Sequence, residues 1–257
     1  MSALDAVLVL LAGLAAGAIN TVVGSGTLVT FPTLLVLGYP PLTANVSNNI
    51  GLVAGGLSGS WGYRHELTGQ SGALRRLAPA SFVGSVVGAT LLLVLPAAAF
   101  KAIVPVLVAV ALVFVVVGPR LQAAAARRQA ATAPTAAWRG WALIGGVLLS
   151  GVYGGYFGAA QGILMMGVFS ALSSMPLQRA TGFKNVLVTL VNLVATVAFL
   201  LFAREHVDWF VVVLIALGSF AGGVLGARVG RRLPPQVLRG AILVVGTVAL
   251  VKLVWFS

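Results

Sequence analysis

The sequence predicts an all-α polytopic membrane protein made of two inverted-topology repeats, each with a broken or re-entrant helix pair plus three transmembrane helices. The first observation is composition: of 257 residues, 60% are hydrophobic and only 8% are charged, whereas a soluble domain carries roughly a quarter charged residues. The second is a series of apolar segments along the whole length. The third is a repeat of the first half in the second, with the basic loops exchanged.

Ten apolar segments are separated by short polar or glycine-rich stretches. Two of them, 27–38 and 160–173, are too short to cross about 30 Å of hydrocarbon at about 1.5 Å per residue. Both follow glycine-rich breaks, which favours a broken or re-entrant helix, although the sequence leaves open whether they span or re-enter. The others are 4–23, 42–63, 74–95, 98–118, 141–156, 179–203, 209–230 and 237–256.

The two halves of the chain repeat each other. "SFVGSVVGA" at 81–89 and "SFAGGVLGA" at 219–227 share six of nine residues at an offset of 138. Earlier in each half the offset is 136, which pairs Gly26 with Gly162 and Asn49 with Asn185. We therefore expect three parts: a first membrane repeat at 1–118, a basic cytoplasmic linker at 119–140 and a second membrane repeat at 141–257.

Basic loops predict how the halves are oriented. Arginines lie in loop 64–77 of the first half but in loop 228–239 of the second, so the basic loop changes place between them. By the positive-inside rule the two halves then face opposite ways. This layout puts 13 of the 16 Lys and Arg in cytoplasmic loops and both termini outside. It also accounts for the net charge of +12 without a nucleic-acid partner.

The glycine breaks before the two short segments are candidate binding elements. Glycine lets the backbone turn sharply and approach a ligand closely. A helix that begins after such a turn presents free N–H groups, which suits an anion; the alternative is close helix packing through small residues. The candidates are Asn20, Gly24, Ser25, Gly26 and Thr27 in "NTVVGSGT", and Tyr156, Gln161 and Gly162 in "YFGAAQGI".

Polar residues also gather in the segment after each short helix. The stretch "NVSNNIG" at 45–51 aligns with "TGFKNVL" at 181–187, and residues three or four apart share a helix face. Several N–H donors with one cation would suit a desolvated oxyanion. The alternatives are interhelical hydrogen bonds for the amides and a snorkelling lysine at the membrane interface. The candidates are Asn45, Asn48 and Asn49 in the first half, and Thr181, Lys184 and Asn185 in the second.

The residue types that the chain lacks exclude several functions. With no cysteine and two distant histidines, we expect no metal site. No P-loop occurs, and no serine is expected near a histidine, so neither a cofactor nor enzymatic activity is predicted. The four carboxylates fall in expected loops or at helix ends. They leave no acidic relay inside the membrane and nothing negative to hold a cation.

Two long stretches of the chain resemble a known family. "GLAAGAINTVVGSGTLVTFPTLLVLGYPPLTANVSNN" and "GVYGGYFGAAQGILMMGVFSALSSMPLQRATGFKN" are similar to the first and second repeats of the TauE/SafE family. The resemblance covers nearly the whole chain. It implies an inner-membrane transporter of sulfite, sulfoacetate or other organosulfonates, with a translocation site at the breaks and polar faces. Where the family often has three successive glycines, this chain has "GSGT" and "AAQG", so Ser25 and Gln161 are expected to tune the substrate.

Together these observations predict a secondary transporter that exports a small sulfur-containing anion across the plasma membrane by alternating access of two inverted repeats. An anion channel and a non-transporting accessory subunit stay open as alternatives. The expected partners are the anion and the lipid bilayer, and a homodimer is left open. The anion, the direction of transport and the coupling ion are not given by the sequence.

Overall fold

The computed structural model describes residues 1–130, 137–229, 240, 242–248 and 250–251. These residues form α-helices and two short 3-10 turns, Arg64–Leu67 and Arg204–His206, with no strand among them, which confirms the all-α prediction. The tenth apolar segment, 237–256, lies partly outside the described residues. The named helices are α1 Ala3–Val22, α2 Thr27–Val36, α3 Pro41–Gly62, α4 Ser71–Val94, α5 Ala97–Ala130, α6 Ala137–Tyr156, α7 Gln161–Leu172, α8 Leu177–Phe202 and α9 Trp209–Val229.

The predicted linker at 119–140 is largely helical. Helix α5 continues through Pro119 as far as Ala130, and α6 already begins at Ala137. The stretch is rich in Ala, Arg and Gln, which are strong helix formers, and they outweigh the interruption at a single proline. Residues 131–136 lie outside the described residues. The division of the chain into two membrane repeats stays a prediction.

Local sequence sets where several helices begin. Helix α1 starts with a capping box, in which the Ser2 side chain accepts a hydrogen bond from the Asp5 amide and the Asp5 carboxylate accepts one from the Ser2 amide. Helices α3 and α8 each follow a proline in extended conformation, Pro40 and Pro176. Proline disfavours a helical conformation in the residue before it. Each of these prolines therefore separates its helix from the short helix before it.

Helix lengths match a bilayer for some elements only. Within the described residues, five helices are long and apolar enough to cross a membrane: α1, α4, the Ala98–Ala124 part of α5, α8 and α9. Helices α2 and α7 have only 10 and 12 residues, or roughly 15 and 18 Å at 1.5 Å per residue. Neither reaches across about 30 Å of hydrocarbon. The prediction of two short helices after glycine-rich breaks is therefore confirmed.

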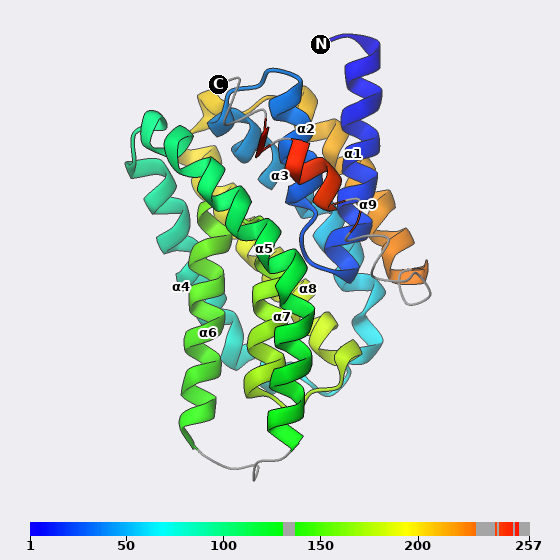
Figure 1. Cartoon of the computed structure of the whole chain (residues 1–257), viewed down its shortest axis with the longest axis vertical. Coiled ribbons are helices and arrows are strands. Elements are labelled where there is room, and N and C mark those ends of the chain that lie inside the picture. The colour runs from blue at the N-terminus through cyan, green and yellow to red at the C-terminus, as the bar shows by residue number, and fades with distance from the viewer. Residues whose placement is uncertain (131–136, 230–239, 241, 249, 252–257) are drawn as a thin grey trace.

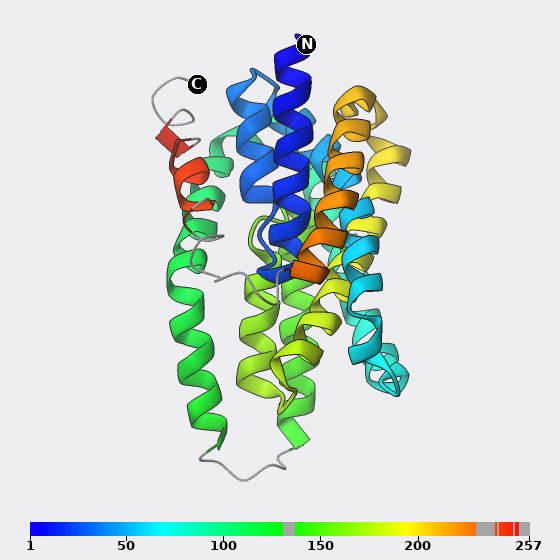
Figure 2. The same cartoon turned by 90° about the vertical axis from the view of Figure 1, so that its right-hand side faces the viewer.

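The short helices turn back beside the helices that precede them. In Figures 1 and 2, α1 descends from the N-terminus to the middle of the molecule, and α2 returns towards the end where α1 began. Helix α6 rises from the opposite end, and α7 returns to that end. The two helical hairpins therefore meet near the middle height of the molecule. These opposite directions are what an inverted repeat requires, although the duplication itself stays a prediction from sequence.

The most extensive helix contacts join the two halves. Helix α1 packs along α9, and α4 packs along α6. Glycines make both contacts close: a Cβ on Gly222 of α9 would lie 2.0 Å from the Leu14 carbonyl oxygen, and one on Gly88 of α4 would lie 2.1 Å from that of Val152. Small residues such as Gly88 and Gly222 let helix backbones approach closely in membrane proteins. Each half thus supplies the fourth helix that covers the first helix of the other half.

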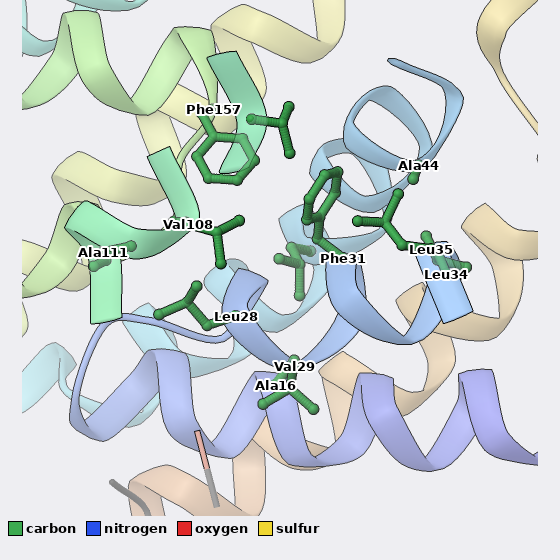
Figure 3. Packing of buried hydrophobic residues seen from close by; sticks show 14 of the residues in the cluster. Ala16, Leu28, Val29, Phe31, Leu34, Leu35, Ala44, Val108, Ala111 and Phe157 are labelled. Carbon is green, nitrogen blue, oxygen red and sulfur yellow. The ribbon is translucent and has the colours of Figure 1, made fainter. Parts of the chain in front are cut away.

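An apolar cluster holds the hairpin tips in place. Figure 3 shows Phe31 of α2 beside Phe157 from the second break, with Leu28 and Val108 nearby. The two rings meet edge to face, with centroids 5.1 Å apart. Both side chains are almost fully buried. The cluster connects α2, α5 and the second break, and so fixes one hairpin tip relative to the other.

Candidate functional site

The first break is a tight turn between α1 and α2. Gly24 has φ +92°, a left-handed conformation that glycine adopts without strain. The amide of Gly26 donates to the side-chain oxygen of Asn20 at 2.9 Å. This bond satisfies one of the free N–H groups at the start of α2. The predicted candidate Asn20 therefore stabilises the turn through its side chain.

The second break, between α6 and α7, has a related geometry. Gly158 has φ +78° and Ala160 has φ +60°. Ala160 is equivalent to Gly24 at the 136-residue offset, so both breaks use a left-handed residue at the same position. For alanine this conformation is strained by about 1–2 kcal/mol. Ala160 is fully buried, and the packing of the hairpin around it must compensate for that strain.

The two breaks touch each other through their glycines. The amide of Gly162 donates to the carbonyl oxygen of Gly24 at 3.0 Å. A Cβ on either glycine would lie 2.5 Å from the Cα of the other, a separation that a real side-chain atom does not reach. We call this contact the glycine crossing. One predicted glycine from each break thus comes together in one place, and only glycine fits at either side.

Lys184 lies directly over the glycine crossing. Its side chain is 1% exposed, and its Cδ would be 2.9 Å from a Cβ on Gly162. The ammonium donates to the carbonyl oxygens of Asn20 at 2.6 Å and Thr21 at 3.1 Å. Helix α1 ends at Val22, so these carbonyls belong to the negative end of its dipole, where a cation is stabilised. The ammonium is buried and does not snorkel to an interface.

The three asparagines of α3 are all buried, but they contact three different elements. The Asn45 amide donates to the Tyr156 carbonyl oxygen, at the end of α6, at 3.2 Å. Asn48 accepts from Thr30 and donates to Thr27 at 3.5 Å, both on α2. Asn49 donates to Asn192 on α8 at 3.5 Å. The cluster therefore joins α3 to both hairpins and to α8, and interhelical bonding is part of its role.

Several of the predicted residues keep polar atoms without a partner among the described residues. They include the Ser25 hydroxyl, both amide atoms of Gln161, the Asn185 side-chain nitrogen and the Tyr156 hydroxyl. Ser25 and Gln161 are equivalent at the 136-residue offset, and each is next in sequence to a glycine of the crossing: Ser25 follows Gly24, and Gln161 precedes Gly162. Leaving a buried polar group unpaired costs about 1–3 kcal/mol. Such groups are therefore candidates for binding a polar ligand.

Thr181 has a different position from the other candidates. Its hydroxyl donates to the Leu177 carbonyl oxygen at 2.8 Å, a bond within its own helix. The sequence reasoning also missed residues. Thr21 supplies a carbonyl to Lys184, Thr30 binds Asn48, and Asn192 binds Asn49. The spacing of polar residues along α8 could have indicated Asn192, whereas contacts made by backbone carbonyls leave no signal in side-chain type.

A narrow polar cavity lies beside these residues, between α1, α3 and α8. Its lining includes Asn20, Thr21, Asn185 and Asn192. The free volume is about 10 Å³, which is room for about one water molecule. Asn20 and Thr21 line this cavity and also hold Lys184, so the cavity lies beside the lysine and the glycine crossing.

Comparison with known proteins identifies relatives along nearly the whole chain. Residues 9–253 match the family model described as "Sulfite exporter TauE/SafE". The chain is 28% identical over 243 residues to the "Probable membrane transporter protein YfcA" of Escherichia coli K12, which covers 94% of this chain and 87% of the relative. It is 29% identical to the "Probable membrane transporter protein ORF9" of a Sinorhizobium species, over 93% of this chain and 88% of the relative. No solved structure matches the chain significantly.

Proposed function

Because the chain belongs to the TauE/SafE family of sulfite exporter-like membrane transporters, we propose that it carries a small sulfur-containing oxyanion across the plasma membrane. Sulfite, sulfoacetate and other organosulfonates form the substrate class. The protein works as a secondary transporter whose two inverted repeats give alternating access to one site. The site is the polar region around the glycine crossing.

The observation that carries this proposal is the environment of Lys184. The ammonium is buried, and the hydrogen bonds described for it go to two backbone carbonyls. Carbonyls carry partial charges only, so an oxyanion that reaches the site offers the ammonium a stronger partner. The anion would replace the carbonyl contacts and take further hydrogen bonds from the unpaired groups. Those groups are the Ser25 hydroxyl, the Gln161 amide and the Asn185 amide.

The remaining charges favour an anion over a cation. The carboxylates Asp5, Glu66, Glu205 and Asp208 lie near helix starts or in the 3-10 turns, away from the glycine crossing. No acidic relay follows from these positions, so we propose a uniport driven by the anion gradient and the membrane potential. An inside-negative potential would favour export, by about 2.3 kcal/mol per charge per 100 mV.

Counterflow in proteoliposomes tests the proposal. Purified protein is reconstituted with an excess of one unlabelled anion inside, and uptake of labelled sulfite is followed from outside. The panel of internal anions contains sulfite, sulfoacetate, taurine, sulfate and thiosulfate. Stimulation by an internal organosulfonate or sulfite supports a carrier of this class. Fast flux without stimulation would instead indicate a channel, and no flux with monodisperse protein would overturn the proposal.

A further inference from the structure

Helix α8 carries a polar stripe that the candidate site uses only in part. Asn185, Thr189, Asn192 and Thr196 follow each other at intervals of four, three and four residues. This spacing places all four on one helix face. Hydrogen bonds show that the face is turned towards α3. We call the contact between this stripe and α3 the polar seam.

The hydrogen bonds across the polar seam are long. The Thr189 and Ser60 hydroxyl oxygens lie 3.3 Å apart. Asn49 donates to Asn192 at 3.5 Å and accepts from Thr196 at 3.3 Å. Typical hydrogen bonds measure about 2.7–3.2 Å from an amide donor and about 2.5–3.0 Å from a hydroxyl donor. The bonds that join α3 to α8 are therefore weak, and water or an oxyanion could replace them at low cost.

The narrow cavity opens onto this seam. Its lining includes Gly56 and Gly59 of α3 with Thr189 and Asn192 of α8, and the side-chain nitrogen of Asn185 has no partner there among the described residues. Asn185 is 5% exposed, so its free donor is buried. The same cavity is lined by Asn20 and Thr21, whose carbonyls hold Lys184. The seam is thus continuous with the region around Lys184.

Two other large contacts between the halves, α1–α9 and α4–α6, are close-packed. At α1–α9 and α4–α6, glycines bring the helices so near that an added Cβ would lie 2.0–2.1 Å from a backbone oxygen, as at Gly222 and Gly88. Separating these helices would open voids that apolar side chains cannot fill. At the polar seam a Cβ on Gly56 would meet the Thr189 hydroxyl oxygen at 2.5 Å, which belongs to a side chain and not to the backbone. A change of conformation is therefore easiest along the seam.

We propose that the polar seam is the path by which the anion moves between the Lys184 region and one side of the membrane, and that Asn185, Thr189 and Asn192 select it by hydrogen bonding. This inference rests on the proposed function and extends the binding region to residues of α8 that had no role in it. Amide and hydroxyl groups can replace the water around an oxyanion. The seam residues carry no charge, so they do not hold the anion so tightly that it cannot leave.

Cysteine labelling tests the path directly, because the native chain contains no cysteine. Single variants Thr189→Cys and Asn192→Cys place a thiol in the seam. Ala195→Cys is the matched buried control on the same helix, and Val197→Cys is an exposed control on its outer face. Each reconstituted variant is treated with 2-sulfonatoethyl methanethiosulfonate, an organosulfonate that reacts with thiolates in water. Two seam positions are used so that a folding defect in one leaves the other informative.

We expect both seam cysteines to react at least tenfold faster than Ala195→Cys and Val197→Cys, and labelling of Asn192→Cys to reduce counterflow of labelled sulfoacetate at least tenfold. Sulfoacetate should slow the labelling; sulfite is unsuitable as protectant or as transported anion here, because it cleaves both the reagent and the disulfide that labelling forms. Seam cysteines that react no faster than the Ala195→Cys control, in protein with normal counterflow, would overturn the path alone. Rapid labelling of the seam cysteines, together with no counterflow of any anion in the native protein before labelling, would instead overturn the proposed function.

Discussion

The two helix breaks are built on one plan but differ in charge. At the first, Lys184 of α8 donates to the carbonyl of Asn20; at the second, Asn45 of α3 donates to the carbonyl of Tyr156. Asn20 and Tyr156 are equivalent at the 136-residue offset, and each donor comes from the third helix of the other half. The carbonyl at the first break is therefore bound by a cation, and the carbonyl at the second break by a neutral amide. The difference shows that two breaks with the same backbone plan can carry one charged and one uncharged donor.

The turns differ in a second respect. At the equivalent left-handed position the first break has Gly24 and the second has Ala160. The orphaned polar groups beside them are a small hydroxyl at Ser25 and a larger amide at Gln161. The amide of Gln161 also packs over Gly154, where a Cβ would meet it at 2.2 Å. The second break is therefore the more strained of the two, because it places alanine where the first has glycine.

Removing the charge should have the largest effect. Lys184→Met keeps the length of the side chain but removes the cation, which we expect to weaken anion binding by about 3 kcal/mol, or roughly 100-fold. The half-saturating anion concentration in counterflow measures this change. Lys101→Met, at an exposed position on α5, is the matched control and should leave it unchanged. An unaltered anion affinity in folded Lys184→Met protein would contradict the role of the first break.

Separating the two breaks should come next. Gly162→Ala places a methyl group 2.5 Å from the Gly24 Cα, so the hairpins must move apart, at a cost of about 1–3 kcal/mol in stability. Gly167→Ala on the same helix meets nothing within 4 Å and should be neutral or stabilising by up to about 1 kcal/mol. Thermal unfolding in detergent compares them. Equal Tm values for the two variants would show that the glycine crossing is not close-packed in the membrane protein.

Removing the neutral donor should have a smaller effect than removing the cation. Asn45→Leu leaves the Tyr156 carbonyl without its side-chain donor, which we expect to lower stability by about 1–2 kcal/mol. Because no charge is lost, anion affinity should change less than tenfold. Tm and counterflow measured on the same preparation separate these effects. A loss of affinity as large as that of Lys184→Met would show that the two breaks are functionally equal.

Relieving the strained turn should have the smallest effect. Ala160→Gly removes the cost of a left-handed alanine, about 1–2 kcal/mol, and adds the unfolded-state entropy of glycine, about 0.4–1 kcal/mol. We expect a net gain in stability of about 0.5 kcal/mol, seen as a small rise in Tm. The reverse change at the equivalent position, Gly24→Ala, should be destabilising because its Cβ would meet Gly162. A fall in Tm for Ala160→Gly would mean that the turn is not strained.

Much of the fold could be predicted from the sequence because local sequence patterns determine it. Apolar segment length identified the helices, and glycine clusters marked both breaks at the residues where the chain turns. The apolar segment ended at residue 118, whereas α5 continues to Ala130, because the helix formers after Pro119 extend the helix beyond its apolar part. The packing of α1 against α9 and of α4 against α6 could not be predicted. The outer faces of membrane helices are all apolar, so hydropathy does not indicate which helix packs against which.

The sequence indicated which residues lie at the candidate site, but it indicated their contacts less well. Gly24, Gly162 and Lys184 do lie together, and the 136-residue offset had already paired the two breaks. That Lys184 would bind the end of α1 was not predictable, because its partners are backbone carbonyls, which every residue has. Asn45, Asn48 and Asn49 were correctly expected to be buried and polar. Their three separate partners depend on helix packing, which the spacing of residues does not specify.

The packing of α1 against α9 has a consequence for how the protein is made. The ribosome produces about 5–20 residues per second, and α9 begins only at Trp209. Helix α1 therefore spends on the order of 10–40 s in the membrane before its main partner exists. During that time the glycine surface around Gly13 and Gly17 is open to lipid or to other proteins. Docking of α1 against α9 is thus a late event, completed near the end of synthesis and not half by half.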